Sequence, residues 1–60
     1  MTYTYTFKGL TDEQLNKFYK IIKSIPFDVV AEFDEWADVM GLELVVNESR
    51  YITELTVIGA

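Results

Sequence analysis

Apolar and polar residues alternate strictly at the start of the chain. Tyr3, Tyr5 and Phe7 are separated by single threonines, and Lys8 closes the run. A period of two in strongly β-favouring residues is typical of a strand with one buried face. We therefore predict a first strand over residues 2–8 whose aromatic side chains face the core.

The next segment changes to helical spacing. Its apolar stripe consists of Leu15, Phe18, Tyr19, Ile21, Ile22 and Ile25. Its predicted outer face carries three lysines, Lys17, Lys20 and Lys23. Thr11 can cap the helix, and Gln14 can complete a capping box. Because Pro26 cannot continue a helix and disfavours helical backbone at the residue before it, we predict a helix over residues 12–24 and a break before the proline.

A second helical segment follows the proline. Its predicted core stripe consists of Val29, Val30, Phe33, Trp36, Ala37 and Met40. Glycine is the residue that most often follows the last turn of a helix, because it adopts the left-handed conformation without strain. Because Pro26 interrupts the preceding helix, we predict that this helix begins at Phe27 or Asp28. The glycine predicts that it ends at Gly41.

Two further apolar segments flank a short polar one. Leu42, Leu44 and Val46 occupy every second position, and residues 51–58 are rich in β-branched side chains. The intervening residues 47–50, Asn-Glu-Ser-Arg, are typical of a turn. The pattern therefore predicts a β-hairpin.

The predicted elements follow the order β-α-α-β-β. We expect an α+β fold, a single small domain over residues 1–60, in which two helices pack on one face of a three-stranded sheet. The third predicted strand is long and has apolar residues on both faces. We therefore place it in the centre of the sheet, with the first and second strands at the edges.

The composition narrows the range of functions. Ten acidic and five basic side chains give a net charge of −5, and the chain contains no His and no Cys. A negative field repels nucleic acid and anionic lipid. The usual zinc ligands and the usual neutral-pH general base are missing, and a chain of this length has little volume for a pocket that tunes a catalytic pKa. We expect a non-enzymatic protein with no metal or cofactor that binds neither nucleic acid nor membrane directly.

The N-terminal segment also bears on location. It lacks a basic region followed by a hydrophobic run, as a signal peptide would have, and no apolar stretch is long enough to span a bilayer. We expect a cytoplasmic protein, located in the host cytoplasm if a phage encodes it.

The second helical segment concentrates negative charge. No Lys or Arg occurs between Lys23 and Arg50. A helical arrangement places five carboxylates on one flank, those of Asp28, Glu32, Asp34, Glu35 and Asp38. Val39 lies among these acids and forms an apolar spot of the kind that anchors protein interfaces. Carboxylates about 5 to 6 Å apart along a helix resemble the spacing of DNA phosphates.

We interpret this flank as a surface that imitates nucleic acid and binds a basic surface on a protein that handles nucleic acid. The simpler interpretation is that an amphipathic helix needs a polar outer face, which water solvates. Single exposed apolar residues such as Val39 are also ordinary. The sequence is consistent with both interpretations.

One short segment resembles a known family. Residues 44–49, Leu-Val-Val-Asn-Glu-Ser, are similar to the strand segment that carries a Glu-Ser pair in the phage uracil-DNA glycosylase inhibitors, small acidic DNA mimics. The resemblance implies that Glu48 contacts the DNA groove of a target enzyme. It covers six residues only, Arg50 follows where that family has an apolar residue, and the order of elements differs. We therefore do not assign the chain to that family.

Our preferred hypothesis is a small acidic inhibitor of phage or mobile-element type. Its expected partner-binding residues are Asp28, Glu32, Asp34, Glu35, Asp38, Val39 and Glu48. Two alternatives stay open. The first predicted strand has little charge to protect its edge, which favours a homodimer or an accessory module that works by edge-strand pairing. A small antitoxin or immunity protein would share the acidic face and bind a toxin.

Overall fold

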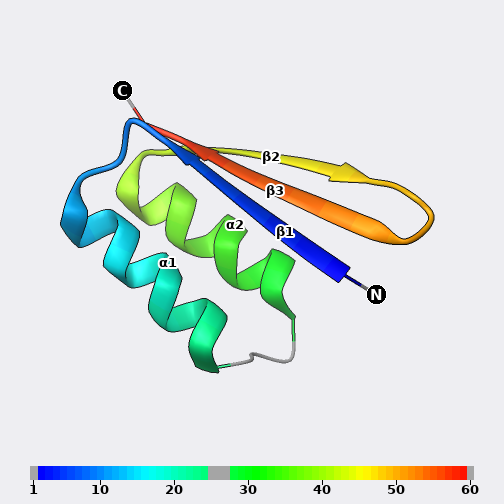
Figure 1. The fold of residues 1–60 in the computed structure, drawn as a ribbon. Helices are drawn as coiled ribbons and strands as arrows, with labels where there is room; N and C mark the ends of the chain where they lie inside the picture. Colours follow the sequence, from blue (N-terminus) through cyan, green and yellow to red (C-terminus); the bar gives the residue numbers. More distant parts are fainter. Residues whose placement is uncertain (1, 25–27, 60) are drawn as a thin grey trace.

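A three-stranded sheet is covered on one face by two helices (Figure 1). The computed structural model describes residues 2–24 and 28–59. Its elements, in chain order, are β1 (Thr2–Lys8), α1 (Asp12–Ser24), α2 (Val29–Met40), β2 (Glu43–Glu48) and β3 (Ile52–Ile58). The predicted α+β class and the order β-α-α-β-β are confirmed. The predicted chain break before Pro26 lies outside the described residues.

β3 occupies the centre of the sheet, as predicted, in the order β1-β3-β2. β1 runs parallel to β3, and Thr2 lies opposite Ile52. β2 runs antiparallel to β3, and Glu48 lies opposite Thr53. Within the described part of the chain, β3 therefore has a neighbour on both sides, whereas β1 and β2 each have one free edge.

The core lies between the sheet and the helices, and its centre is aromatic. The ring of Phe33, on α2, lies 4.9 Å from the ring of Phe18, on α1, and 5.5 Å from the ring of Tyr5, on β1. The buried hydrophobic residues are Phe18, Ile21, Phe33, Ala37, Leu55 and Val57. Fully burying a large apolar side chain contributes about 1.5–3 kcal/mol, so these few residues supply much of the stability of so short a chain.

Local hydrogen bonds fix the helix ends. The Thr11 N–H donates to Oε1 of Gln14 at 2.9 Å, and the Gln14 N–H donates to Oγ1 of Thr11 at 3.3 Å, which completes the predicted capping box. Asp28 caps α2, since its Oδ1 accepts from the Ala31 N–H at 3.1 Å. Gly41 ends α2 in the left-handed conformation, with φ of 70°. The predicted start of α1 and the predicted end of α2 at Gly41 are confirmed. α2 begins at Val29, one residue after the predicted alternative Asp28, and the other alternative, Phe27, lies outside the described residues.

The predicted hairpin turn is too long. β2 continues through Asn47 and Glu48, which lie opposite Glu54 and Thr53 of β3. Pairing with the central strand overrides the weak strand preference of these two polar residues. The Ser49 hydroxyl donates to the Ile52 carbonyl at 2.9 Å, so Ser49 helps to close a shorter turn.

Candidate protein-binding surfaces

The outer side of α2 carries most of the predicted partner-binding residues. Asp34, Glu35 and Asp38 are exposed, and Glu32 is half-buried. The structure records no ion pair between these four carboxylates and any Lys or Arg of the described residues. Their charge is therefore not neutralised by direct pairing within that part of the chain. We call the surface formed by Asp28, Glu32, Asp34, Glu35, Asp38 and Val39 the α2 acidic face.

Asp28 lies at the beginning of this face and also has a structural task. It is exposed, and its carboxylate accepts the hydrogen bond that caps α2. The N-terminus of a helix carries a partial positive charge, which stabilises a carboxylate there. Local structure therefore explains Asp28 by itself, whereas Asp34, Glu35 and Asp38 have no such local task.

Val39 is the apolar part of the α2 acidic face. Its side chain is 67% exposed, which agrees with the prediction that it points away from the core. Trp36, three residues earlier, is only half-buried and packs against the core cluster. Of Val39 and Trp36, Val39 is therefore the one that offers a partner an apolar contact on the acidic side of α2.

Glu48 does not belong to the α2 acidic face. It is the last residue of β2, in the hairpin that Figure 1 shows extending beyond the helices. The predicted set therefore consists of six residues gathered on one helix and its cap, and one residue on a separate element. A partner that contacted all seven would have to reach both the helix and the hairpin.

One of the three α1 lysines faces α2 rather than solvent. Nζ of Lys17 lies 3.8 Å from the centre of the Trp36 ring, and the Lys17 side chain is half-buried. A cation over an aromatic face is attracted by the ring. The prediction that Lys17 lies on the outer face with Lys20 and Lys23 is therefore wrong for Lys17, while Lys20 and Lys23 are exposed.

The hairpin of β2 and β3 is an apolar surface that the sequence analysis missed. Its exposed large apolar residues are Val45, Val46, Tyr51 and Ile52. A seven-residue strand spans about 23 Å, whereas the twelve residues of α2 span about 18 Å. This difference in length is the signal that could have predicted the exposure of Val46, which lies opposite Leu55 on the helix side of the sheet. Val45 and Ile52 lie on the other face of the sheet, which neither α1 nor α2 covers.

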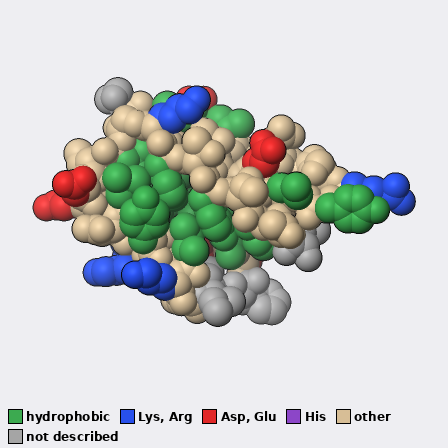
Figure 2. All heavy atoms as spheres, in the orientation of Figure 1, with side chains coloured by type: hydrophobic (Ala, Val, Ile, Leu, Met, Phe, Trp, Pro, Cys, Tyr) green, Lys and Arg blue, Asp and Glu red, His purple; other side chains and the backbone are tan. Residues whose placement is uncertain are grey.

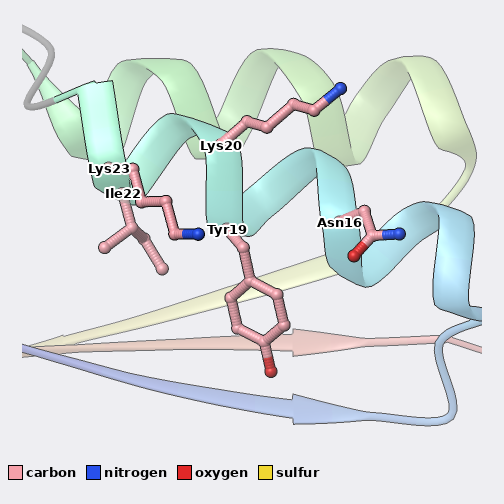
Figure 3. Close-up of a pocket in the computed structure, with 5 residues that line it drawn as sticks. All are labelled: Asn16, Tyr19, Lys20, Ile22 and Lys23. Atoms are coloured by element: carbon pink, nitrogen blue, oxygen red, sulfur yellow. The ribbon is translucent and has the colours of Figure 1, made fainter.

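A second missed feature lies beside α1. Tyr19 was predicted in the core, but its side chain is 45% exposed, and its ring contacts Phe7 edge-on at 5.6 Å. Figure 3 shows Tyr19 and Ile22 pointing from α1 towards the sheet. They border a hollow of about 390 Å³ that is lined by Asn16, Tyr19, Lys20, Ile22 and Lys23.

Tyr5 lies in an environment that shifts its pKa. Burial raises the pKa of the Tyr5 phenol, and the nearby Tyr3 adds a smaller contribution in the same direction. The Tyr5 hydroxyl therefore stays protonated at neutral pH. Among residues 2–24 and 28–59, no three His, Cys, Asp or Glu side chains are placed to hold a metal ion. No helix in these ranges has both the length and the apolar character to cross a membrane.

No protein-family model matches the chain, and neither the curated proteins nor the solved structures include a significant match to it.

Proposed function

We propose that this protein is a non-enzymatic binding protein whose α2 acidic face docks on a basic surface of another protein and blocks it. The observation that carries the proposal is the group of exposed carboxylates of Asp34, Glu35 and Asp38, which have no ion pair with any described Lys or Arg. A basic surface that accepts such a face is of the kind that contacts nucleic acid phosphates.

Charge and apolar contact have different tasks in this proposal. Exposed carboxylates accelerate the encounter with a basic surface and orient the two proteins. Val39, exposed among them, supplies the apolar contact that lengthens the life of the complex. Because α2 is fixed at its N-terminus by Asp28 and at its C-terminus by Gly41, the face is presented on a rigid element.

A pair of matched charge reversals tests the proposal. Tagged protein is incubated with bacterial lysate at low and at high salt, and the captured proteins are identified by mass spectrometry. We expect Asp34→Lys/Glu35→Lys to abolish capture of a basic, nucleic-acid-handling protein while thermal unfolding changes little, because both residues are exposed. The control Glu43→Lys/Glu54→Lys makes the same change in net charge on the opposite face of the sheet.

Two results would decide against the proposal. If capture survives the reversal on α2, the acidic face is only solvated. If the control abolishes capture equally, net charge rather than the α2 acidic face is responsible. Loss of capture at high salt is expected as well, since the Debye length falls from about 10 Å at 0.1 M to about 3 Å at 1 M ionic strength.

The free edge of β1 supports a second candidate function, self-association or an accessory role through edge-strand pairing. β1 has β3 as its neighbour on one side only within the described residues. Backbone pairing depends little on salt, so a homodimer that persists in sedimentation at high salt would favour this candidate over the electrostatic one. An antitoxin or immunity protein would use the same acidic face. Capture of a toxin from the lysate would favour this alternative.

A further inference from the structure

We propose that the side of α1 that lies beside β1 binds the same side of α1 in a second copy of this chain, with the two helices antiparallel. We call this surface the α1 flank, and its residues are Asp12, Asn16, Tyr19, Ile22 and Lys23. The inference goes beyond the proposed function and beyond the edge-strand pairing considered with it, because side chains of α1 rather than the backbone of β1 make the contact.

The α1 flank is a continuous stripe along the helix. Its members Asp12, Asn16, Tyr19 and Lys23 follow one another at spacings of four, three and four residues. Residues at such spacings share one face of a helix. Asn16, Tyr19 and Lys23 line the hollow of about 390 Å³ beside α1, and Tyr19 and Ile22 point from the helix towards the sheet (Figure 3). The stripe therefore has an acid near its N-terminal end, a lysine near its C-terminal end and an aromatic ring between them.

The α1 flank faces away from α2 and its acidic face. Lys17 contacts Trp36 of α2, and Tyr19 lies two residues further along, about 200° around the helix. The Tyr19 ring contacts Phe7 of β1, which is an edge strand of the described sheet. Two copies that meet at this flank therefore keep their α2 acidic faces apart. α1 itself carries three lysines and two acids, so its own charge does not oppose the approach of an acidic protein.

The α1 flank is only partly covered within one copy. The Tyr19 side chain is 45% exposed, although its ring belongs to the apolar stripe of α1. Asn16 and Lys23 are exposed, and Ile22 is half-buried. Figure 2 shows hydrophobic side chains exposed on the side of the molecule where β1 and α1 lie. A second copy that covers this side would remove apolar surface from water.

The charges of the α1 flank complement themselves across a two-fold axis. In a symmetric dimer each contact occurs twice, once in each direction. Asp12 and Lys23 are equally far from the midpoint between Asn16 and Tyr19, so two antiparallel flanks place Asp12 beside the partner's Lys23 at both ends. In the middle, the short Asn16 side chain leaves room for the partner's Tyr19. Within residues 2–24 and 28–59 the structure records no ion pair for Asp12 or Lys23, so both charges are available to a second copy.

The same charges select against other pairings of the helices. Two parallel α1 flanks would place Asp12 beside the partner's Asp12 and Lys23 beside the partner's Lys23, and like charges repel. The α2 acidic face cannot bind itself, because it carries five carboxylates and no base. Of the two helices, α1 is therefore the one that can pair with its own copy.

Charge reversals test the inference. Sedimentation equilibrium of the intact protein measures the dissociation constant of the dimer. We expect a weak dimer, with a dissociation constant in the micromolar range, because the flank spans only about 20 Å of helix. Asp12→Lys and Lys23→Asp should each weaken the dimer about tenfold or more, because both attractions across the interface become repulsions.

An equimolar mixture of the two variants gives the decisive measurement. At one end of the mixed dimer the two changed side chains face each other with opposite charges, and at the other end the two original side chains do so. The mixture should therefore form a heterodimer that recovers most of the lost affinity, although neither variant dimerises well alone. A variant that failed to fold would not be rescued in this way, so the mixture separates assembly from stability.

The control variants change the net charge by the same amounts away from α1. Glu54→Lys lies on β3 and Arg50→Asp lies in the hairpin turn, and both positions are exposed. Neither should change the dissociation constant of the dimer appreciably. If the controls weaken the dimer as much as the α1 variants do, net charge rather than the α1 flank is responsible.

Three further outcomes would overturn the inference. The first is an intact protein that is still monomeric at about 1 mM. The second is a mixture of the two α1 variants that dimerises no better than each variant alone. The third is a dimer that survives both reversals and protects the backbone N–H groups of Tyr3, Tyr5 and Phe7 from hydrogen exchange, which would show edge-strand pairing instead. The proposed function fails separately, since lysate capture that survives Asp34→Lys/Glu35→Lys rejects it and leaves dimerisation through α1 unaffected.

Discussion

At the scale of single residues, two glycines are required for different reasons. A side chain at Gly59 would collide with the backbone carbonyl of Gly9, and the Gly59 N–H also bonds to the Lys8 carbonyl. Gly41 has open space around its Cα, but its φ of 70° is a conformation that side chains disfavour. One glycine therefore prevents a clash, and the other permits a turn.

We expect Gly59→Ala to destabilise the fold by about 1–3 kcal/mol, because rigid backbone must move to accept the methyl group. Gly41→Ala should cost about 1–2 kcal/mol, and Gly41→Asn less, because asparagine tolerates the left-handed region. Urea unfolding of the three variants measures these costs. If Gly41→Asn destabilised the fold more than Gly59→Ala, that result would contradict the assignment of a clash at Gly59.

Asp28 combines a cap and a charge, and two substitutions separate them. Asp28→Asn keeps a cap acceptor, so we expect nearly unchanged stability and weaker capture of a basic partner. Asp28→Ala should also lose about 1 kcal/mol of stability, because the Ala31 N–H loses its acceptor. Thermal unfolding and lysate capture measure the two effects. Equal stability of the two variants would show that the cap contributes little.

Tyr5 gives the fold a pH dependence in the alkaline range. Its pKa in the folded protein is raised above the usual 10.0, chiefly by burial. The unfolded chain therefore releases this proton first, so the contribution to stability is fully present below pH 10 and is lost as the pH rises above it. We expect Tyr5→Phe to flatten the fall in unfolding free energy above pH 10. An unchanged alkaline profile would exclude Tyr5 as the cause.

At the scale of elements, α1 and α2 are held together by an aromatic core and by the contact of Lys17 with Trp36. We expect Lys17→Gln to cost about 0.5–1 kcal/mol and to alter the fluorescence of Trp36, because the cation leaves the ring face. Lys20→Gln on the same helix is the control and should change neither quantity. Identical spectra for the two variants would show that the contact does not persist in solution.

The sequence predicted the elements well where the signals are local. The capping box of Thr11 and Gln14 and the left-handed Gly41 are each defined by neighbouring residues, so these two helix ends could be placed. The start of α2 was predicted to within one residue, because Asp28 caps the helix and Val29 begins it. The central position of β3 also followed from its apolar residues on both faces. These features depend on short segments of chain.

The features that the sequence could not predict depend on tertiary contacts. Tyr19 fits the apolar stripe of α1, but no strand covers it beyond β1 among the described residues, so it stays partly exposed. Lys17 fits the polar side of α1, but Trp36 of α2 lies next to it. At the candidate site, the exposure of Val39 could be predicted, whereas the separation of Glu48 from α2 required the fold.

At the scale of the whole molecule, charge is distributed unevenly. The α2 acidic face carries most of the acids of the helix layer, and Lys20 and Lys23 lie on the side of α1. The net charge of −5 is therefore the sum of an acidic surface on α2 and a basic one on α1. The proposed basic partner would approach the protein on the α2 side.

Like charges on α2 should make stability depend on salt. At 0.01 M ionic strength the Debye length is about 30 Å, close to the longest dimension of the molecule, 31 Å, and at 0.15 M it is about 8 Å. We expect Tm to rise by a few degrees over this range. Asp34→Asn/Asp38→Asn should reduce the rise, because it removes two of the repelling charges. If Tm rose with salt as much in this variant as in the unchanged protein, the repulsion would not come from Asp34 and Asp38.

The central position of β3 also sets the order in which the protein can form during its synthesis. Both helices and both edge strands leave the ribosome before β3, yet each edge strand needs β3 to pair with. Loss of β1 would remove one edge of the sheet, whereas a chain that stops before Ile52 has no sheet at all. Nascent chains should therefore stay unfolded, with Phe18 and Phe33 accessible to chaperones, until Leu55 and Val57 emerge.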